Sequence, residues 1–305
     1  MTQSWRFFVV RVARMTRLSP TFVRATFTGP DLDQLADNGF DQRIKLVIPL
    51  PGADIADMPM GPDWFAQWRA LPDERRLPIR TYTVRAVRPA ARELDVDLAL
   101  HGEIGPASRW ALSARPGDSV AIIGPNAEYD GEHGGLEFSR KVGTADLSSA
   151  SVLLAGDETA VPAVLSIVER LPHGVSGTAL LEVPHPDDAL PVAAPPGLTV
   201  TWLARGERPH GELLVPAVTA AAARLAPALA GVGAGGPADL AVVDPDLDHD
   251  ILWEVPGEPT GRLYGWIAGE SGVVMSLRRQ LLADGVFTRE TAAFMGYWRR
   301  GRSES

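Results

Sequence analysis

The sequence predicts a two-domain protein, an antiparallel β-barrel followed by an α/β domain built on a parallel sheet. The chain has 305 residues, 45% of them hydrophobic, which is enough to form two cores of ordinary size. Residues 1–145 contain short apolar, β-branched segments separated by turn residues. In residues 146–305 such segments alternate with helical ones, as they do around a parallel sheet.

Strands are expected in the first domain at 5–12, 21–28, 43–49, 80–88, 93–100 and 118–123. The fifth shows the clearest pattern, because leucine and valine at even positions of 94–100 alternate with aspartate and alanine. Strands of this length and spacing favour a small antiparallel barrel or sandwich. A loop at 50–78 and a short helix at 106–113 interrupt them.

The second domain begins after a polar junction at 140–150 that is rich in small residues. Strands are expected at 151–156, 178–183, 198–204, 238–243 and 263–269, and helices from the first strand to about residue 171, at 216–230 and at 271–283. The last helix carries its apolar residues on one face, and Gly285 follows as its cap. Strands that alternate with helices pair in parallel, with helices on both faces of the sheet.

The composition excludes several classes of protein. The chain has no cysteine, which excludes disulfides, a thiolate nucleophile and cysteine-ligated clusters. Its formal charge of −9 provides no dominant positive field for nucleic-acid phosphates. The apolar stretches are too short or too interrupted for a signal peptide or a membrane span, and the six histidines lack metal-ligand spacing. We therefore expect a cytoplasmic monomer with no nucleic-acid partner, no membrane insertion and no resident metal.

The first motif that suggests a ligand site is Arg80-Thr81-Tyr82-Thr83, on a predicted barrel strand. Arg80 and Tyr82 share one face of the strand, and Thr83 offers a hydroxyl from the next position. A guanidinium, an aromatic ring and a hydroxyl suit a flat ring system joined to a diphosphate. A solvent-facing strand is the alternative, because this short pattern often occurs by chance.

A second motif runs from His101 to Trp110, where a predicted strand leads into the short helix. Its glycines allow close approach of the backbone, and Pro106 fits a first helical turn. The helix N-terminus, with Ser108 beside it, is suited to an anion. The alternative is an ordinary strand–turn–helix connection in which His101 is merely hydrogen-bonded.

The third motif, Gly156-Asp157-Glu158-Thr159, follows the first strand of the second domain and opens a helix. An open α/β sheet binds a dinucleotide at this position. Thr159 is expected to cap the helix, with Pro162 in its first turn. The two carboxylates would repel a phosphate, so a dinucleotide should lie across the backbone. Capping alone also explains much of this spacing.

The last third of the chain adds a strand end, a helix and a terminal segment. Residues 266–270, W-I-A-G-E, end a strand at the same edge of the sheet, and Arg278 and Arg279 follow on the next helix. Aromatic and basic residues alternate in 296–301, G-Y-W-R-R-G. That segment is either a solvated tail or a contact for an aromatic, anionic ligand.

The motifs R-T-Y-T, H-G-x-x-G-P-A-S-R-W-A, G-D-E-T-A-V-P-A, W-I-A-G-E and G-Y-W-R-R-G occur in a fixed order. Together they resemble the siderophore-interacting protein family, FAD-dependent ferric-chelate reductases with a ferredoxin-reductase-like architecture. The resemblance runs from about Phe8 to Arg302. It implies a barrel that binds FAD and an α/β domain that binds NAD(P)H.

The resemblance also implies roles for single residues. Arg80 would hold an FAD phosphate, Tyr82 the isoalloxazine face and Thr83 the N5 region. The residues implied for FAD are Arg80, Thr81, Tyr82, Thr83, His101, Gly105, Pro106, Ala107, Ser108 and Trp110, and those implied for the dinucleotide are Gly156, Asp157, Glu158, Thr159 and Glu270.

In this family, basic side chains around the flavin opening receive the ferric chelate. The positions that fit are Lys45, Arg278, Arg279, Arg299 and Arg300. Lys45 is one of only two lysines, although it could equally be an ordinary exposed strand residue.

Arg205 and Arg208 could meet a 2′-phosphate, which favours NADPH slightly over NADH, although a surface loop is the simpler explanation of these two arginines.

The resemblance implies an NAD(P)H-dependent flavoprotein that reduces a ferric siderophore or other ferric chelate, so that Fe²⁺ is released for assimilation. Flavin supplies the redox chemistry, so no side-chain acid or base is named. Two alternatives stay open. One is a general NAD(P)H:flavin or quinone reductase of the same fold, and the other is a siderophore-binding carrier without catalytic activity.

Overall fold

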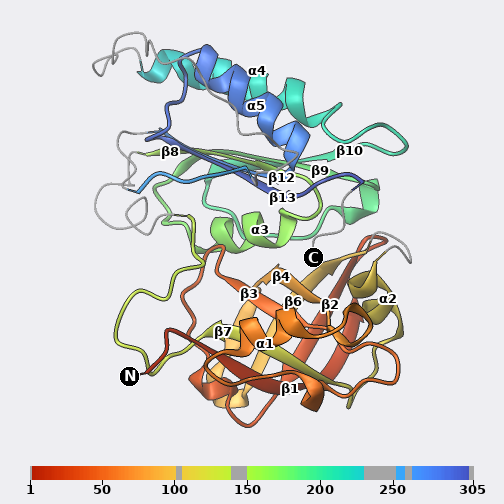
Figure 1. The fold of residues 1–305 in the computed structure, drawn as a ribbon. Helices are drawn as coiled ribbons and strands as arrows, with labels where there is room; N and C mark the ends of the chain where they lie inside the picture. Colours follow the sequence, from red (N-terminus) through yellow and green to blue (C-terminus); the bar gives the residue numbers. More distant parts are fainter. Residues whose placement is uncertain (1, 101–104, 139–149, 230–251, 258–262, 302–305) are drawn as a thin grey trace. The chain divides into compact units, whose positions relative to one another are not determined.

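The computed structural model describes residues 2–100, 105–138, 150–229, 252–257 and 263–301 (Figure 1). The chain divides into two compact units, one formed by residues up to Leu136 and the other by residues from Glu137 onward. The predicted domain boundary at 145/146 and the predicted strand at 238–243 lie outside the described residues.

The first unit is an antiparallel sheet in the order β4-β3-β7-β1-β2-β6-β5. Its strands are β1 (Trp5–Arg17), β2 (Phe22–Thr28), β3 (Arg43–Val47), β4 (Ile79–Thr83), β5 (Ala86–Arg88), β6 (Glu93–Ala99) and β7 (Ser119–Pro125). The continuous segment 79–88 pairs with β3 through β4 and with β6 through β5. One chain segment thus joins the two edges of the sheet, which curls into the predicted barrel.

Successive side chains along each strand point alternately into the barrel and away from it. Leu94, Val96 and Leu98 of β6 belong to the core inside the barrel. On the other side of β3, Val47 belongs to a separate apolar cluster, which is covered by the segment 50–78 and its short helix α1 (Trp64–Ala70). A second helix, α2 (Pro106–Ser113), forms where it was predicted and packs Trp110 against the inner core.

The second unit is a six-stranded sheet in the order β10-β9-β8-β12-β13-β11. Its strands are β8 (Ser151–Gly156), β9 (Ser176–Val183), β10 (Gly197–Ala204), β11 (Trp253–Glu254), β12 (Leu263–Glu270) and β13 (Ala292–Trp298), and its helices are α3 (Val161–Arg170), α4 (Leu214–Leu229) and α5 (Ser271–Ala283). The strands are parallel except β11. Helices α4 and α5 cover one face and α3 the other (Figure 1).

The main difference from prediction is β13. Residues 292–298 form a buried strand beside β12, so the aromatic residues before Arg299 are part of the sheet and do not form a solvated tail. Tyr297 stacks on Trp253 of β11, with ring centroids 5.9 Å apart. The end of β13 therefore lies at the same edge of the sheet as the ends of β8 and β12.

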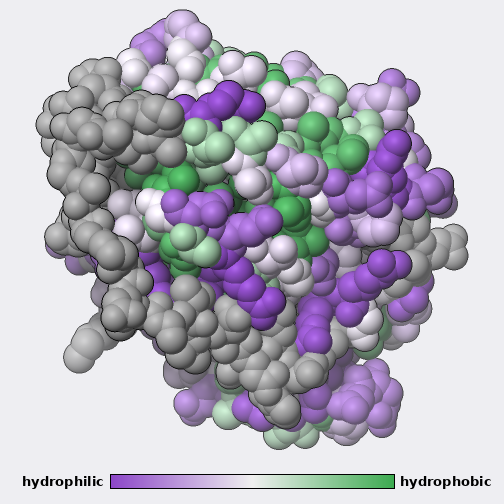
Figure 2. Space-filling model, turned by 90° about the horizontal axis from the view of Figure 1, so that it is seen from above, coloured by the Kyte–Doolittle hydropathy of each residue, from purple (hydrophilic) through white to green (hydrophobic). Residues whose placement is uncertain are grey.

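The surface on the side of α4 and α5 mixes hydrophobic and hydrophilic residues (Figure 2). Such a mixture is ordinary for a protein surface. Among the described residues, no helix is both long enough and apolar enough to cross a bilayer.

Candidate functional site

In the first unit, Arg80 and Tyr82 lie half-buried on the inner side of β4. Their register partners on β3 are Leu46 and Ile44, which belong to the barrel core, and Tyr82 packs against that core. Burial raises the pKa of Tyr82 to about 12, so its hydroxyl stays protonated at neutral pH and can donate a hydrogen bond. The strand thus places a neutral aromatic ring beside a cation.

Arg80 has hydrogen-bonding capacity to spare. To the described residues its side chain makes one hydrogen bond, in which Nη1 donates to the carbonyl oxygen of Ile79 at 2.9 Å. A guanidinium has five N–H donors, and among the described residues only this one of them has a partner. This is the arrangement expected of an arginine that pairs with a phosphate.

Thr81 and Lys45 are exposed and lie on the opposite face of the β3–β4 pair. They are register partners, and Lys45 Nζ lies 3.5 Å from Thr81 Oγ1. Thr83 is buried. The predicted chelate residue Lys45 therefore faces away from the side of the strand pair that carries Arg80 and Tyr82.

The N-terminus of helix α2 has no side-chain cap among the described residues. Gly105 precedes the helix with φ of 85°, a conformation that favours glycine, and a Cβ there would meet none of the described atoms within 4 Å. Ser108 is buried, and Trp110 stacks on Phe27 with ring centroids 6.2 Å apart. The Trp110 Nε1 has no hydrogen-bond partner among the described residues. His101 lies outside them.

These residues fit FAD. A flavin dinucleotide needs a cation and main-chain donors for its diphosphate and a flat, neutral surface for its ring system. Arg80 offers the first, the start of α2 the second and Tyr82 the third.

In the second unit, Asp157 joins three strand ends. It follows β8, and its Oδ2 accepts hydrogen bonds from the Glu270 main-chain N–H at 2.7 Å and from Trp298 Nε1 at 2.8 Å. Its Oδ1 accepts from both the main-chain N–H and the hydroxyl of Thr159. Burial and the charge of the neighbouring Glu158 raise the pKa of Asp157. The carboxylate is thus fully occupied within the sheet edge.

Glu158 is buried in an ion pair. Arg205 donates to both of its oxygens at 2.6 and 2.7 Å, and His210 Nε2 lies 3.2 Å from Oε1. Burial disfavours the charged carboxylate, but the hydrogen bonds from His210 and Arg205 outweigh it and lower the pKa of Glu158 to about 2. The predicted repulsion between this carboxylate and a phosphate is therefore largely neutralised.

This pairing corrects the interpretation of Arg205. Only 6% of Arg205 is exposed, and Glu158 occupies its guanidinium, so it is not available for a 2′-phosphate. Arg208 is exposed and lies 3.4 Å from Glu212. Of the two arginines that favoured NADPH over NADH, only Arg208 therefore remains a candidate for the 2′-phosphate.

The start of α3 also differs from prediction. Thr159 does not cap the helix; its hydroxyl bonds to Asp157, and Ala160 takes the N-cap position without a side-chain hydrogen bond. Pro162 lies in the first turn, as predicted. Gly156 is required sterically, because a Cβ there would lie 2.6 Å from the carbonyl oxygen of Ala268 on β12.

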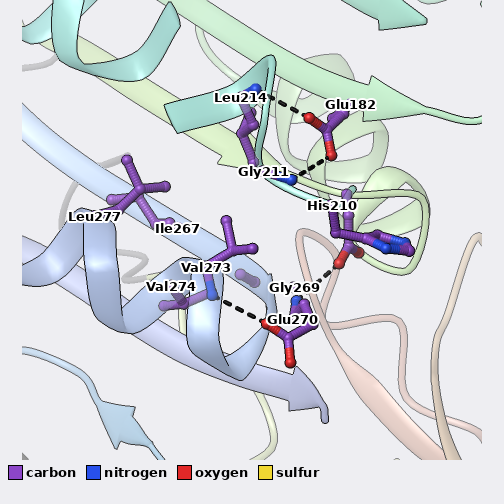
Figure 3. Close-up of a pocket in the computed structure, with 12 residues that line it drawn as sticks. Glu182, His210, Gly211, Leu214, Ile267, Gly269, Glu270, Val273, Val274 and Leu277 are labelled. Atoms are coloured by element: carbon purple, nitrogen blue, oxygen red, sulfur yellow. Dashed lines mark hydrogen bonds between the residues drawn. The ribbon is translucent and has the colours of Figure 1, made fainter. Parts of the chain in front are cut away.

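A small recess, partly open to solvent, lies where the strand order reverses between β8 and β12 (Figure 3). Ligands of open α/β sheets bind at this position. Asp157, Glu182, Glu270 and His210 supply its polar lining. The carboxylates of Asp157 and Glu182 already accept several hydrogen bonds each, so they hold the walls of the recess in place.

Sequence reasoning missed Glu182 and His210. Glu182 is buried on β9 and accepts hydrogen bonds from the main-chain N–H groups of Gly211, Leu213 and Leu214, so it caps α4 (Figure 3). The available signal was a carboxylate inside the apolar segment T-A-L-L-E-V, because buried charges need partners.

The structure separates the predicted chelate-binding arginines of this unit. Arg278 is 0% exposed and donates from Nε and Nη2 to Glu254, each at 2.8 Å. This placement argues against a chelate-binding role for Arg278. Arg279 and Arg300 are exposed, and Arg299 is half-buried.

Acid is expected to remove about 3 kcal/mol of stability contributed by Glu158. Its pKa falls from 4.5 to about 2 on folding, so the contribution is complete above about pH 4.5 and is lost as the pH falls towards 2. Urea unfolding between pH 2 and 6 measures this loss. His210→Ala removes one of the hydrogen bonds that lower the pKa of Glu158. The stability of this variant should therefore change less than that of the wild type between pH 2 and 6. Equal changes in both proteins would contradict the assignment.

Known proteins resemble the chain along nearly its whole length. Residues 11–129 match the siderophore-interacting FAD-binding domain, and residues 149–301 match the siderophore-interacting protein model. An uncharacterized protein of Mycobacterium tuberculosis is 32% identical over 299 residues, covering 96% of this chain and 90% of that protein. The ferric vibriobactin reductase ViuB of Vibrio cholerae is 27% identical over 293 residues, covering 95% and 89%.

Solved structures agree in fold. A siderophore utilization protein from T. fusca is 27% identical with a TM-score of 0.70, covering 99% of this chain and 96% of that chain. The ferredoxin reductase in carbazole 1,9a-dioxygenase is 11% identical with a TM-score of 0.59, covering 96% of this chain and 70% of that one, and shows a ferredoxin-reductase-like fold alone. Since the two family models follow one another along nearly the whole chain, the protein belongs to the siderophore-interacting protein family.

Proposed function

We propose that this protein is an FAD-dependent oxidoreductase of the cytoplasm that uses NAD(P)H to reduce ferric siderophores and thereby releases Fe²⁺. The observation that carries the proposal is the pairing of Arg80 and Tyr82 on β4, within the matched FAD-binding domain. The name of the relative ViuB, a ferric vibriobactin reductase, supports the substrate class.

FAD held by these residues would supply the redox chemistry, since a flavin can accept a hydride from NAD(P)H and donate single electrons to chelated Fe³⁺. The protein's own residues bind and orient. Arg80 and the N-terminus of α2 would compensate the diphosphate charge, and the neutral Tyr82 ring would pack against the flavin. The carboxyl edge of the second sheet, around Gly156, would receive the dinucleotide.

The charge of the chain constrains how an anionic chelate can bind. A net charge of −9 repels a ferric siderophore of negative charge, so local cations must reverse the field. Arg279 and Arg300 are exposed and remain candidates, whereas Lys45 faces away from the side of the strand pair that carries Arg80 and Tyr82. Arg278 is removed from this set by its buried pair with Glu254.

A ferrous-trapping assay tests the function. The FAD-loaded protein is supplied with NADH or NADPH and with ferric catecholate, hydroxamate or citrate, and Fe²⁺ is followed by a chromogenic chelator. We expect Fe²⁺ to form with at least one chelate. NAD(P)H oxidation with free flavin or quinone but no chelate would favour a general reductase. Chelate binding without NAD(P)H oxidation would favour a carrier.

Arg80→Ala is expected to weaken FAD binding roughly 10- to 100-fold, because a charge-assisted hydrogen bond to phosphate contributes about 1.5–3 kcal/mol. Arg75→Ala removes an exposed arginine of the same unit and serves as the matched control. Fluorescence titration of the apoprotein with FAD measures both. Equal affinities for the two variants would contradict the assignment of Arg80 to the phosphate.

A further inference from the structure

Three motifs meet at the end of β13. Asp157 Oδ2 accepts from Trp298 Nε1 at 2.8 Å, and the Ser271 hydroxyl donates to the carbonyl oxygen of Trp298 at 2.9 Å. Glu270 Oε1 accepts from the main-chain N–H of Arg300 at 3.2 Å. Trp298 is thus held by the residue after β8 and by the first residue of α5, and Arg300 is held by the last residue of β12.

The backbone at this point is shaped to allow these contacts. Gly269 pairs with Gly296, but the next pair is Glu270 with Trp298, so β13 contains one extra residue there. A Cβ on Gly269 would lie 2.7 Å from Asp157 Oδ2, and one on Gly296 would lie 2.4 Å from Ser271 Oγ. Both glycines therefore permit the close approach that brings Asp157 and Ser271 to the strand end.

Asp157 has no hydrogen-bonding capacity left for a dinucleotide. Its two oxygens already accept from Thr159, Glu270 and Trp298. The ring edge of His210 packs against Trp298, with centroids 4.9 Å apart, which fixes the indole from a second side. Arg299 and the exposed Arg300 come directly after Trp298 in the chain.

We infer that Asp157 is a positioning residue: through Trp298 it fixes the end of β13 and so places Arg300 to bind an oxyanion-bearing ligand at the carboxyl edge of the sheet. The oxyanion is a donor oxygen of the ferric chelate or a phosphate of NAD(P)H, since a guanidinium recognises both. The inference rests on the proposed function for these two ligands, but not on turnover.

Binding measurements on a double-mutant cycle test the inference. Trp298→Phe keeps an aromatic ring and removes the N–H, and Arg300→Gln removes the charge. Titration calorimetry of the FAD-loaded protein with ferric citrate, NAD⁺ and NADP⁺, which bind without reducing the flavin, gives the affinities. Each single variant should weaken binding of one ligand about 3- to 10-fold. The double variant should be no weaker than Arg300→Gln alone, because Trp298 acts through Arg300.

Control variants distinguish the loss of Arg300 placement from general damage to the fold. Trp64→Phe changes a half-buried tryptophan of the first unit and should bind all three ligands as the wild type does. Asp157→Ala should reproduce Trp298→Phe, because it removes the acceptor of the indole N–H. The ligand that loses affinity identifies the source of the oxyanion. Unchanged affinities in Trp298→Phe, or losses that add in the double variant, would overturn the inference even if ferric reduction is observed.

Discussion

Replacing Arg205 by alanine is expected to lower the free energy of unfolding by about 3–5 kcal/mol, because it leaves the Glu158 carboxylate buried without its main partner. Both oxygens of Glu158 accept from Arg205, and Glu158 is 0% exposed. The remaining contact with His210, at 3.2 Å, is longer than either. Urea unfolding of the FAD-free protein at pH 7 measures the loss.

Arg208→Ala is the matched control for this prediction. Arg208 is three residues away, is exposed and pairs with Glu212 in the turn before α4, so its removal should cost no more than about 0.5 kcal/mol. Similar losses in the two variants would contradict the buried pair. A specific loss of NADPH affinity in Arg205→Ala, with unchanged stability, would instead restore the 2′-phosphate interpretation.

Replacing Arg278 by alanine is expected to cost about 3–4 kcal/mol of stability. The side chain is fully buried on α5, so truncation leaves a cavity and removes both hydrogen bonds to Glu254 of β11. The partner Glu254 keeps 29% exposure and can be partly rehydrated, which places the expected cost below that of Arg205→Ala. Thermal unfolding at neutral pH gives the comparison.

The adjacent Arg279 provides the contrast, because it lies on the same helix but is exposed. Arg279→Ala should change stability by less than about 0.5 kcal/mol. A ferrous-trapping assay on both variants then shows whether either substitution affects binding of the ferric chelate as well as stability. If Arg278→Ala left the stability unchanged and raised only the KM for the ferric chelate, the buried pair with Glu254 would be refuted.

Much of the fold could be predicted because its patterns are local. The alternation in 94–100 and the one-sided apolar face of 271–283 depend only on neighbouring residues, and both elements form with nearly the predicted bounds. The strand at 292–298 was missed because it ends in aromatic and basic residues near the chain end. Its identity depends on pairing with β12, a contact between distant segments.

The candidate site could be predicted less completely, because sequence does not show exposure. Four arginines of the second unit look equivalent in the sequence but differ in exposure. Arg205 and Arg278 are buried in ion pairs, whereas Arg208 and Arg279 are exposed. Partners of this kind depend on which strand ends and helices meet. Glu254 and Glu158 lie 24 and 47 residues from the arginines they bind, beyond the reach of spacing rules.

Anaerobic single-turnover reduction of a ferric chelate is the sharpest test of electron transfer from NAD(P)H through the flavin to iron. FAD-loaded protein is first reduced by one equivalent of NAD(P)H and is then mixed with excess ferric siderophore and a ferrous trap, while flavin absorbance is followed. We expect NAD(P)H to bleach the flavin, the flavin absorbance to return on mixing, and two Fe²⁺ to form for each NAD(P)H consumed. Flavin that stays bleached in the presence of the chelate, or returns without Fe²⁺, would contradict this expectation.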